Sequence, residues 1–453
     1  MRVALEPPDA VPPPARVPAL LRAVVVAAFV LPADMVFAPL GAIGYVTMIL
    51  ALTLGACWVA AVAWNVNDPA AFRFPARIGL ALFWLSTVSS YVRMSTVTDV
   101  QRAAADRWIL MLLAMTALTL VTAESVRSID SALSFTAVVV GAATVCALVA
   151  VYQFTIGTDP LDHVRTLMVG MTDNGVGTTF QTRGLLTRVA GNTFTPIELG
   201  IVMAMVLPLA VWRALVASRG RAWVHWSQCL LITVACVITV SRSAVLGLLV
   251  AVTLTVPFLP PAARRWAAIA VPGVVVVLFV AVPGLIATLR AAVLADAATD
   301  PSLATRVDNY PRVQAMVIDH PVVGTGPATY IPDDALLILD NQYLHTAVEQ
   351  GLVGLVAFAT LVVLPVVSSV VVAAWTREPR LRLLAAAVGA ACGVAAAGSA
   401  VFDSLSFPVF VIVFPLFLGL SGSVWTMARR AAGRDHLDPP DAPVPARSSE
   451  GDR

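Results

Sequence analysis

The chain is a succession of long apolar runs separated by short polar connections. A run of about 18 or more apolar residues is long enough to cross the hydrocarbon core of a bilayer as a helix. The pattern therefore predicts an all-α fold, a polytopic bundle of about twelve transmembrane helices. The expected spans are 19–36, 41–64, 78–95, 108–125, 132–155, 196–214, 225–240, 243–260, 266–289, 344–373, 382–401 and 408–427.

Composition agrees with this pattern. Of the 453 residues, 59% are hydrophobic and 12% are charged. A soluble protein of this size needs more charge to cover its surface, so the lipid bilayer is the expected environment. All five cysteines fall inside apolar runs, where we expect small buried side chains rather than a disulfide or metal set. We expect no metal, no cofactor and no nucleic-acid partner.

The arginines of the short connections predict the orientation. With about twelve spans they all fall on one side, which the positive-inside bias makes cytoplasmic. This predicts a multi-pass protein of the cell membrane with both termini in the cytoplasm. Residues 1–17 and 431–453 are expected to be disordered tails of a transmembrane domain at 18–430. The arginines concerned are Arg73, Arg77, Arg127, Arg213, Arg219, Arg221, Arg264, Arg265, Arg377, Arg380, Arg382, Arg429, Arg430 and Arg434.

Two long connections lie on the opposite, extracytoplasmic face, at residues 156–195 and 290–343. Loops longer than about 15 residues are uncommon unless they are functional. The second loop contains "NYPRVQAMVIDHP", which predicts a short amphipathic helix at the membrane surface. Asn309 is the expected cap, Pro311 the first helical position and Pro321 the stop. The apolar positions at helical spacing are Val313, Met316 and Val317.

Several arginines are expected on this extracytoplasmic face, where the positive-inside bias does not require them. Arg242, in "ITVSRSAVLGLL", stands between two apolar runs. Guanidinium groups bind phosphate through paired hydrogen bonds and keep their charge in a dry site, so a pyrophosphate is the natural ligand. Alternatively, Arg242 extends to the lipid headgroups and the others contact headgroups or loop carboxylates. The other arginines on this face are Arg183, Arg188, Arg306 and Arg312.

Four segments together resemble the O-antigen ligase and O-antigen polymerase superfamily. They are "RVAGNTFTPIELGIVMAMVLPLA", "SRSAVLGLL", "TRVDNYPRVQAMVIDHPVVGTGPATY" and "DNQYLHTAVEQGLVGL", which span about residues 185–365. The resemblance implies a polytopic glycosyltransferase acting in cell-surface polysaccharide or glycoconjugate biosynthesis. Its donor would be a glycan on a polyprenyl pyrophosphate, and its acceptor a hydroxyl of a glycan, lipid or protein outside the cytoplasm.

The resemblance also implies roles for individual residues. Arg242 and Arg306 match family arginines that hold the pyrophosphate, and Arg312 and Arg188 are further candidates. Such arginines would neutralise the charge that builds on the leaving group without a metal ion. The segment "HPVVGTG" resembles the Pro-x-x-Gly-x-Gly turn of the family. Its glycines, Gly324 and Gly326, are expected to be backbone turn residues.

The chain departs from the family pattern at the expected base. Ligases of the family commonly carry His and a small polar residue, then nine residues, then Gly-x-x-Gly. Here Asp340 and Asn341 stand in the first two positions, before Gly351 and Gly354, which are expected to allow close helix packing. An Asp acts well as a base only if its pKa rises from about 3.9. This departure suits the broader polymerase and ligase-like membership better than the ligase alone.

Two other residues offer an alternative base. His345 and Glu349 are four residues apart, so they share one face if this segment is helical, and they would then form an acid–base pair. The catalytic candidates are therefore Asp340 and Asn341 on one hand, and His345 and Glu349 on the other. A purely structural interpretation also exists, in which Asp340 or Asn341 caps the helix and Glu349 favours its positive end.

Two other functions stay open. A secondary transporter is compatible with about twelve spans, although such proteins place ionisable groups near the midplane of broken helices. A non-catalytic membrane component of a polysaccharide export complex is compatible with the Asp at the expected His position.

Overall fold

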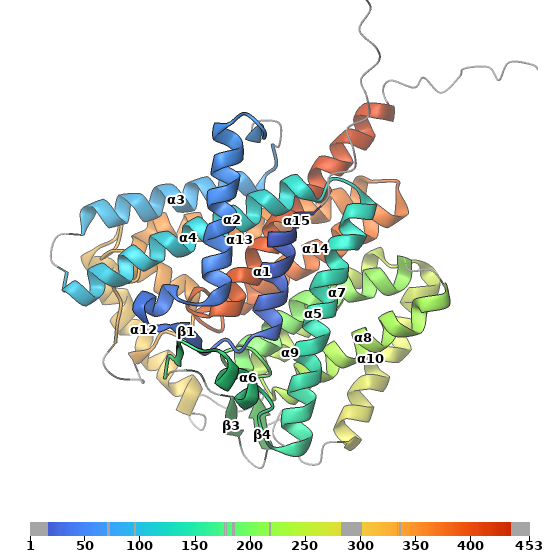
Figure 1. The fold of residues 1–453 in the computed structure, drawn as a ribbon, viewed down its shortest axis with the longest axis horizontal. Helices are drawn as coiled ribbons and strands as arrows, with labels where there is room; N and C mark the ends of the chain where they lie inside the picture. Colours follow the sequence, from blue (N-terminus) through green and yellow to red (C-terminus); the bar gives the residue numbers. More distant parts are fainter. Residues whose placement is uncertain are drawn as a thin grey trace, which may run out of the picture.

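The computed structural model describes residues 17–69, 73–94, 97–175, 177, 179–183, 186–216, 219–281, 301–332, 334 and 337–435. Over these residues the chain is almost entirely helical (Figure 1). Both predicted tails lie almost wholly outside the described residues. At the C-terminal end the last helix continues to Asp435, past the expected start of the tail at residue 431.

Over the described residues each predicted span falls on a helix, while residues 282–289 of the expected span 266–289 lie outside them. Seven of the described helices are long and apolar enough to cross a membrane, namely α2, α4, α5, α7, α13, α14 and α15. Three further apolar helices are shorter, α1, α8 and the segment that begins with α9. The bounds are α1 Ala19–Val30, α2 Val46–Ala63, α3 Ala76–Arg93, α4 Asp99–Ser125, α5 Ile129–Ile156, α7 Pro196–Val216, α8 Ala222–Ile238, α9 Arg242–Thr255, α10 Pro261–Ala281, α13 Gln342–Trp375, α14 Pro379–Gly398 and α15 Pro408–Asp435.

The first two predicted spans are too long at their shared connection. Helix α1 ends at Val30 rather than residue 36, because the residue before Pro32 is driven into an extended conformation. The chain then forms strand β1 (Met35–Phe37) and a 3₁₀ helix, η1 (Ala38–Ile43), before α2 starts. Strand β1 pairs antiparallel with β2 (Met171–Asp173), which belongs to the first long loop.

The first long loop is folded against the ends of the helices. It contains a short helix, α6 (Leu161–Leu167), and a hairpin of β3 (Phe180–Arg183) with β4 (Leu186–Val189). Arg165 of α6 forms ion pairs with Asp34 and Asp159, both at 2.7 Å. These pairs attach the loop to the segment after α1, so two predicted extracytoplasmic connections meet at the same end of the bundle.

The predicted amphipathic helix is longer than expected. Helix α12 runs from Pro301 to Asp319, so Asn309 and Pro311 lie inside it rather than at its start. The sequence pattern failed here because a Pro is also tolerated within a helix whose neighbours satisfy the freed groups. The stop before Pro321 is correct. Val313 is 4% exposed and packs with Leu339 and Val348, so α12 lies against α13.

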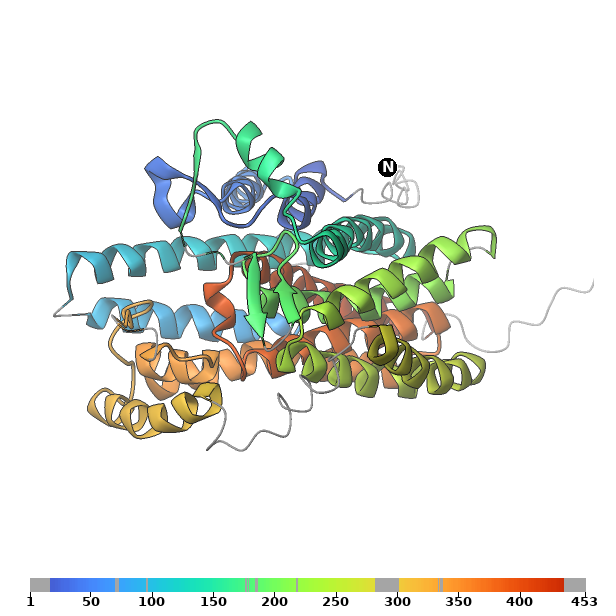
Figure 2. The same cartoon turned by 90° about the horizontal axis from the view of Figure 1, so that it is seen from below.

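Three of the predicted cytoplasmic arginines, Arg77, Arg127 and Arg430, lie at the opposite end. Arg77 pairs at 3.1 Å with Glu124, whose carboxylate also accepts hydrogen bonds from Trp58 and Asn67. Arg127 lies within electrostatic reach of Arg430. Figures 1 and 2 show α6, the β3–β4 hairpin and α12 far from the C-terminal end of α15. These loop elements and these arginines, which the sequence assigns to opposite faces, thus lie apart in the fold, and which face is cytoplasmic stays a prediction.

Helix α15 lies in the centre of the bundle and α2 at its edge. In the most apolar window of α15, 89% of the residues are buried, compared with 17% for α2. This difference corrects one expectation about the cysteines. Cys57 of α2 is exposed, because it lies on the outer face of an edge helix, whereas the other four are buried.

Candidate active site

The N-terminal end of α13 is stabilised by a side-chain N-cap. Asn341 is the N-cap, and its side-chain oxygen accepts hydrogen bonds from the N–H groups of Tyr343 at 2.9 Å and Leu344 at 3.2 Å. The oxygen of Asn341 is therefore engaged in satisfying the first turn. Asp340 lies immediately before it and is partly buried.

His345 and Glu349 meet on one face of the first two turns of α13. The imidazole Nε2 lies 3.1 Å from Glu349 Oε1, and the two side chains are 15% and 1% exposed. The same carboxylate oxygen accepts the backbone N–H of Tyr330 at 3.2 Å. The edge of the Tyr330 ring packs against His345, with 5.7 Å between ring centroids. An almost buried carboxylate thus orients an imidazole whose two ring nitrogens are also buried, although part of its ring is exposed.

Arg312 of α12 braces the loop that covers this pair. Its guanidinium donates to the hydroxyl of Tyr330 at 2.5 Å and to the carbonyl of Leu337 at 2.8 Å. It also lies over the Tyr330 ring, 5.7 Å from the centroid. Arg312 therefore borders the His345–Glu349 pair through Tyr330, rather than standing among the other arginines.

A break in α13 lies directly behind Glu349. Gly351 has φ +66°, so the helix kinks there and frees backbone groups of the helical ladder. The turn at residues 321–326 satisfies them. Leu352 N–H donates to Pro321 O at 2.9 Å, and Gly326 N–H donates to Glu349 O at 2.9 Å. The turn and the kinked helix together fix the backbone of Glu349.

The glycines of this region pack against backbone. A Cβ on Gly324 would lie 2.3 Å from the carbonyl of Glu349, and one on Gly351 would lie 2.4 Å from the carbonyl of Val322. Gly324 and Gly326 both have positive φ, +69° and +125°. Gly354 lies one turn further along α13, where a Cβ would meet the side chain of Gln350.

Asp403 belongs to the same site, although we did not identify it in the sequence. The segment after α14 is joined to the start of α13, because Gln342 N–H donates to Ser399 O at 2.8 Å and Gln342 Oε1 accepts Leu405 N–H at 2.8 Å. Burial raises the pKa of Asp403 to about 6, while nearby His345 opposes the shift. The sequence feature that could have indicated Asp403 is that it is the single acidic residue in the short connection "VFDSLSFP" between two apolar spans.

The raised pKa of Asp403 predicts a pH dependence. Between pH of about 4 and 6 the folded state holds this proton more tightly than the unfolded chain, so the contribution of Asp403 to the free energy of unfolding falls as the pH rises. The activity depends on pH in the opposite direction if the Asp403 carboxylate stabilises a charged His345. In that case the activity rises as the pH increases through about 6. We expect Asp403→Asn to remove that inflection from the pH profile of kcat/KM. An unchanged inflection would assign it to another group.

Two of the predicted arginines flank the turn between α8 and α9. Arg188 in β4 is 8% exposed, and its Nε donates to the carbonyl of Thr239 at 2.8 Å. Its Nη1 donates to Gln181 at 3.3 Å. Arg242 is the first residue of α9, three positions after Thr239. The structure therefore brings Arg188 and Arg242 to one turn.

This turn and the start of α13 border the same segment. Gly247 near the start of α9 packs against Val394 near the end of α14, and Arg382 at the start of α14 lies over the ring of Phe258 just after α9, so the two helices run antiparallel. Arg242 at the start of α9 thus lies at the same end as the segment that follows α14, which holds Asp403. Arg306 lies in α12, and its side chain is outside the described residues.

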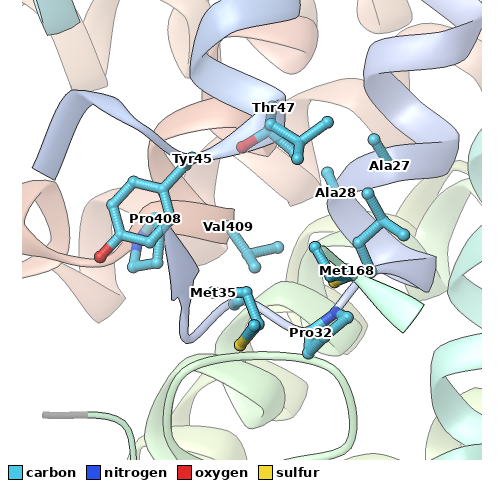
Figure 3. Close-up of a pocket in the computed structure, with 12 residues that line it drawn as sticks. Ala27, Ala28, Pro32, Met35, Tyr45, Thr47, Met168, Pro408 and Val409 are labelled. Atoms are coloured by element: carbon cyan, nitrogen blue, oxygen red, sulfur yellow. The ribbon is translucent and has the colours of Figure 1, made fainter. Parts of the chain in front are cut away.

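A small cavity lies near the end of α1 but offers little chemistry. It encloses about 20 Å³, room for about one water molecule. Figure 3 shows its apolar lining, with Met35, Val409 and Met168 around it and Tyr45 at its edge. Among the described residues, no group of three or more His, Cys, Asp or Glu is placed to hold a metal ion.

A comparison with known families matches part of the chain. Residues 228–359 match a family model described as O-antigen ligase. The match includes Arg242, Arg312, His345 and Glu349, whereas Arg188 and Asp403 lie outside it. No curated protein matches the chain.

Proposed function

We propose that this chain, whose residues 228–359 match the O-antigen ligase family model, is a membrane glycosyltransferase of that superfamily. The proposed reaction transfers a glycan from a polyprenyl pyrophosphate to an acceptor hydroxyl on the extracytoplasmic face. The observation that carries this proposal is the His345–Glu349 pair, 3.1 Å apart at the start of a membrane helix. An imidazole that is oriented by a carboxylate can act as a general base near neutral pH.

In the proposed step the acceptor hydroxyl attacks the anomeric carbon of the donor. The new glycosidic bond forms as the bond to the pyrophosphate oxygen breaks, and polyprenyl pyrophosphate leaves with the bonding pair. We assign the imidazole of His345, whose Nε2 lies 3.1 Å from Glu349, to take the acceptor proton. Both ring nitrogens are buried beneath the Tyr330 segment, so this segment must move to admit the acceptor hydroxyl. The resulting imidazolium lies between Glu349 and the nearby carboxylate of Asp403.

We assign the arginines to stabilise the pyrophosphate leaving group. Arg188 and Arg242 stand at the turn that borders the Asp403 segment. Positive charge in a partly desolvated site favours the pyrophosphate more strongly as its negative charge develops. Arg306 and Arg312 of α12 are assigned to the same leaving group, with Arg312 also bracing Tyr330.

His345 fits the role of base better than Asp340. Asp340 lies in the connection immediately before the N-cap residue Asn341, whereas His345 stands on the first turns of α13 beside Glu349 and Tyr330. His345 has a buried carboxylate to orient it and an opposite charge to stabilise its protonated form. Asp340→Asn is accordingly expected to retain transfer.

The proposed reaction is tested in a strain that lacks this chain. The strain is expected to accumulate polyprenyl-pyrophosphate-linked glycan and lose one surface glycan, and the wild-type gene should reverse both. Arg242→Ala should lower transfer by about 10²–10³-fold, the cost of removing one charge-stabilising group. Membrane extracts analysed for lipid-linked glycan provide the measurement.

Arg265→Ala is the matched control, because Arg265 is exposed at the predicted cytoplasmic end of α10. It should clear the lipid-linked glycan as the wild type does. A deletion strain with no accumulated lipid-linked glycan would contradict the proposed reaction. Concentrative sugar uptake by reconstituted protein would favour a transporter instead.

A further inference from the structure

A large polar cavity opens beside the candidate active site. Its volume is about 630 Å³, and it lies between the end of α3, the start of α4 and the turn that follows α12. Figures 1 and 2 both place these ends on the same side of the bundle as α12. Its polar lining consists of Arg93, Gln101, Asp319, His320, Thr325 and Thr329.

Size and chemistry limit what this cavity can bind. Ligand sites in proteins typically have volumes of about 300–1,000 Å³, which includes the volume found here. A polyprenyl chain requires an apolar lining, and a pyrophosphate requires several cations, whereas a single Arg is present among the described lining residues. Mixed donors and acceptors around the exposed Val322 and the half-buried Val97 and Val323 instead suit a saccharide, which offers hydroxyls and small apolar faces.

The lining has a fixed framework and free ionisable groups. Gln101 donates to Thr329 O at 2.9 Å, and the hydroxyls of Thr325 and Thr329 are 2.8 Å apart. These bonds hold the α4 side of the cavity to the turn. In contrast, Arg93, Asp319 and His320 make no side-chain hydrogen bond or ion pair with the described part of the chain.

One wall of the cavity is formed by the segment that packs against the proposed base. Thr329 lines the cavity, and the next residue, Tyr330, donates its backbone N–H to Glu349 and packs its ring on His345. Gly326 N–H donates to the carbonyl of Glu349 at 2.9 Å. A saccharide seated in the cavity would therefore lie against the segment that positions the His345–Glu349 pair.

We propose that this cavity is the subsite for the acceptor saccharide, with Arg93, Asp319 and His320 as its specificity-determining side chains. The inference rests on the proposed function and adds the class of acceptor, a glycan rather than a lipid or a protein hydroxyl. It also separates the acceptor from the donor pyrophosphate, which is assigned to the arginines of the α8–α9 turn and α12.

The test uses purified full-length protein and one defined probe. The probe is the oligosaccharide released by mild acid from the lipid-linked glycan of the deletion strain. We expect wild-type protein to bind it, and Arg93→Ala and Asp319→Asn each to raise its Kd and its KM as acceptor about tenfold, the cost of one charged contact of about 1.4 kcal/mol. The donor KM should be unchanged. Arg102→Ala is the control, because Arg102 is exposed near Gln101 without lining the cavity.

Each other outcome overturns the inference in a recognisable way. Transfer by a wild-type protein that does not bind the probe would assign the acceptor to another surface or another class. If the two variants raised the KM for the donor and the KM for the acceptor equally, the substituted residues would have a general structural role. A deletion strain without accumulated lipid-linked glycan would instead overturn the proposed function itself.

Discussion

Replacing His345 with alanine is expected to lower glycan transfer by about 10²–10⁴-fold, the usual contribution of a general base. The imidazole lies 3.1 Å from a carboxylate that is 1% exposed, and its own side chain retains 15% exposure. Removing it deprives the acceptor hydroxyl of its proton acceptor while the capped end of α13 stays intact. The measurement is the initial rate of transfer in proteoliposomes, with donor binding measured in parallel.

The control for this variant is His163→Ala, because His163 is exposed on α6. We expect it to leave the rate unchanged. Glu349→Gln should also reduce transfer, since it removes the negative charge that favours a protonated His345. A His345→Ala protein that keeps its full rate while Asp340→Asn loses it would move the base to Asp340.

The second large effect is on folding. Gly351→Ala is expected to destabilise the protein by about 2–5 kcal/mol, which combines overpacking with a strained left-handed backbone. The new Cβ would lie 2.4 Å from the backbone carbonyl of Val322, and φ is +66°. The turn at residues 321–326 would have to move away from the kink. The melting temperature in detergent measures the loss.

Gly141→Ala provides the opposite control. Gly141 lies inside α5, where a Cβ meets nothing within 4 Å. Alanine there should leave the melting temperature unchanged or raise it, because glycine in a helix costs about 0.5–1 kcal/mol relative to alanine. If Gly351→Ala melted like Gly141→Ala, the contact between the turn and the kink would have no role in stability.

Much of the architecture was predictable because bilayer-spanning helices are specified locally. Apolar length located a helix at every expected span over the described residues, and seven of these helices are long and apolar enough to cross a membrane. The orientation that the arginines indicate stays a prediction. The errors lie where local pattern is ambiguous. Pro32 ended α1 early, and α12 extended past Asn309 and Pro311, because a proline inside an apolar run is compatible with a break, a start or a helix interior.

By itself, the sequence determined the helical class, the positions of the helices and the spacing that makes His345 and Glu349 neighbours. These follow from periodicity, which acts over a few residues. Only the tertiary structure decided that Asn341 is a cap, that Arg312 reaches the pair through Tyr330 and that the turn at 321–326 packs on Gly351. It also decided that Asp403, 58 positions after His345, belongs to the same site. Such contacts join segments far apart in the chain, and they depend on how the helices pack, which no local pattern specifies.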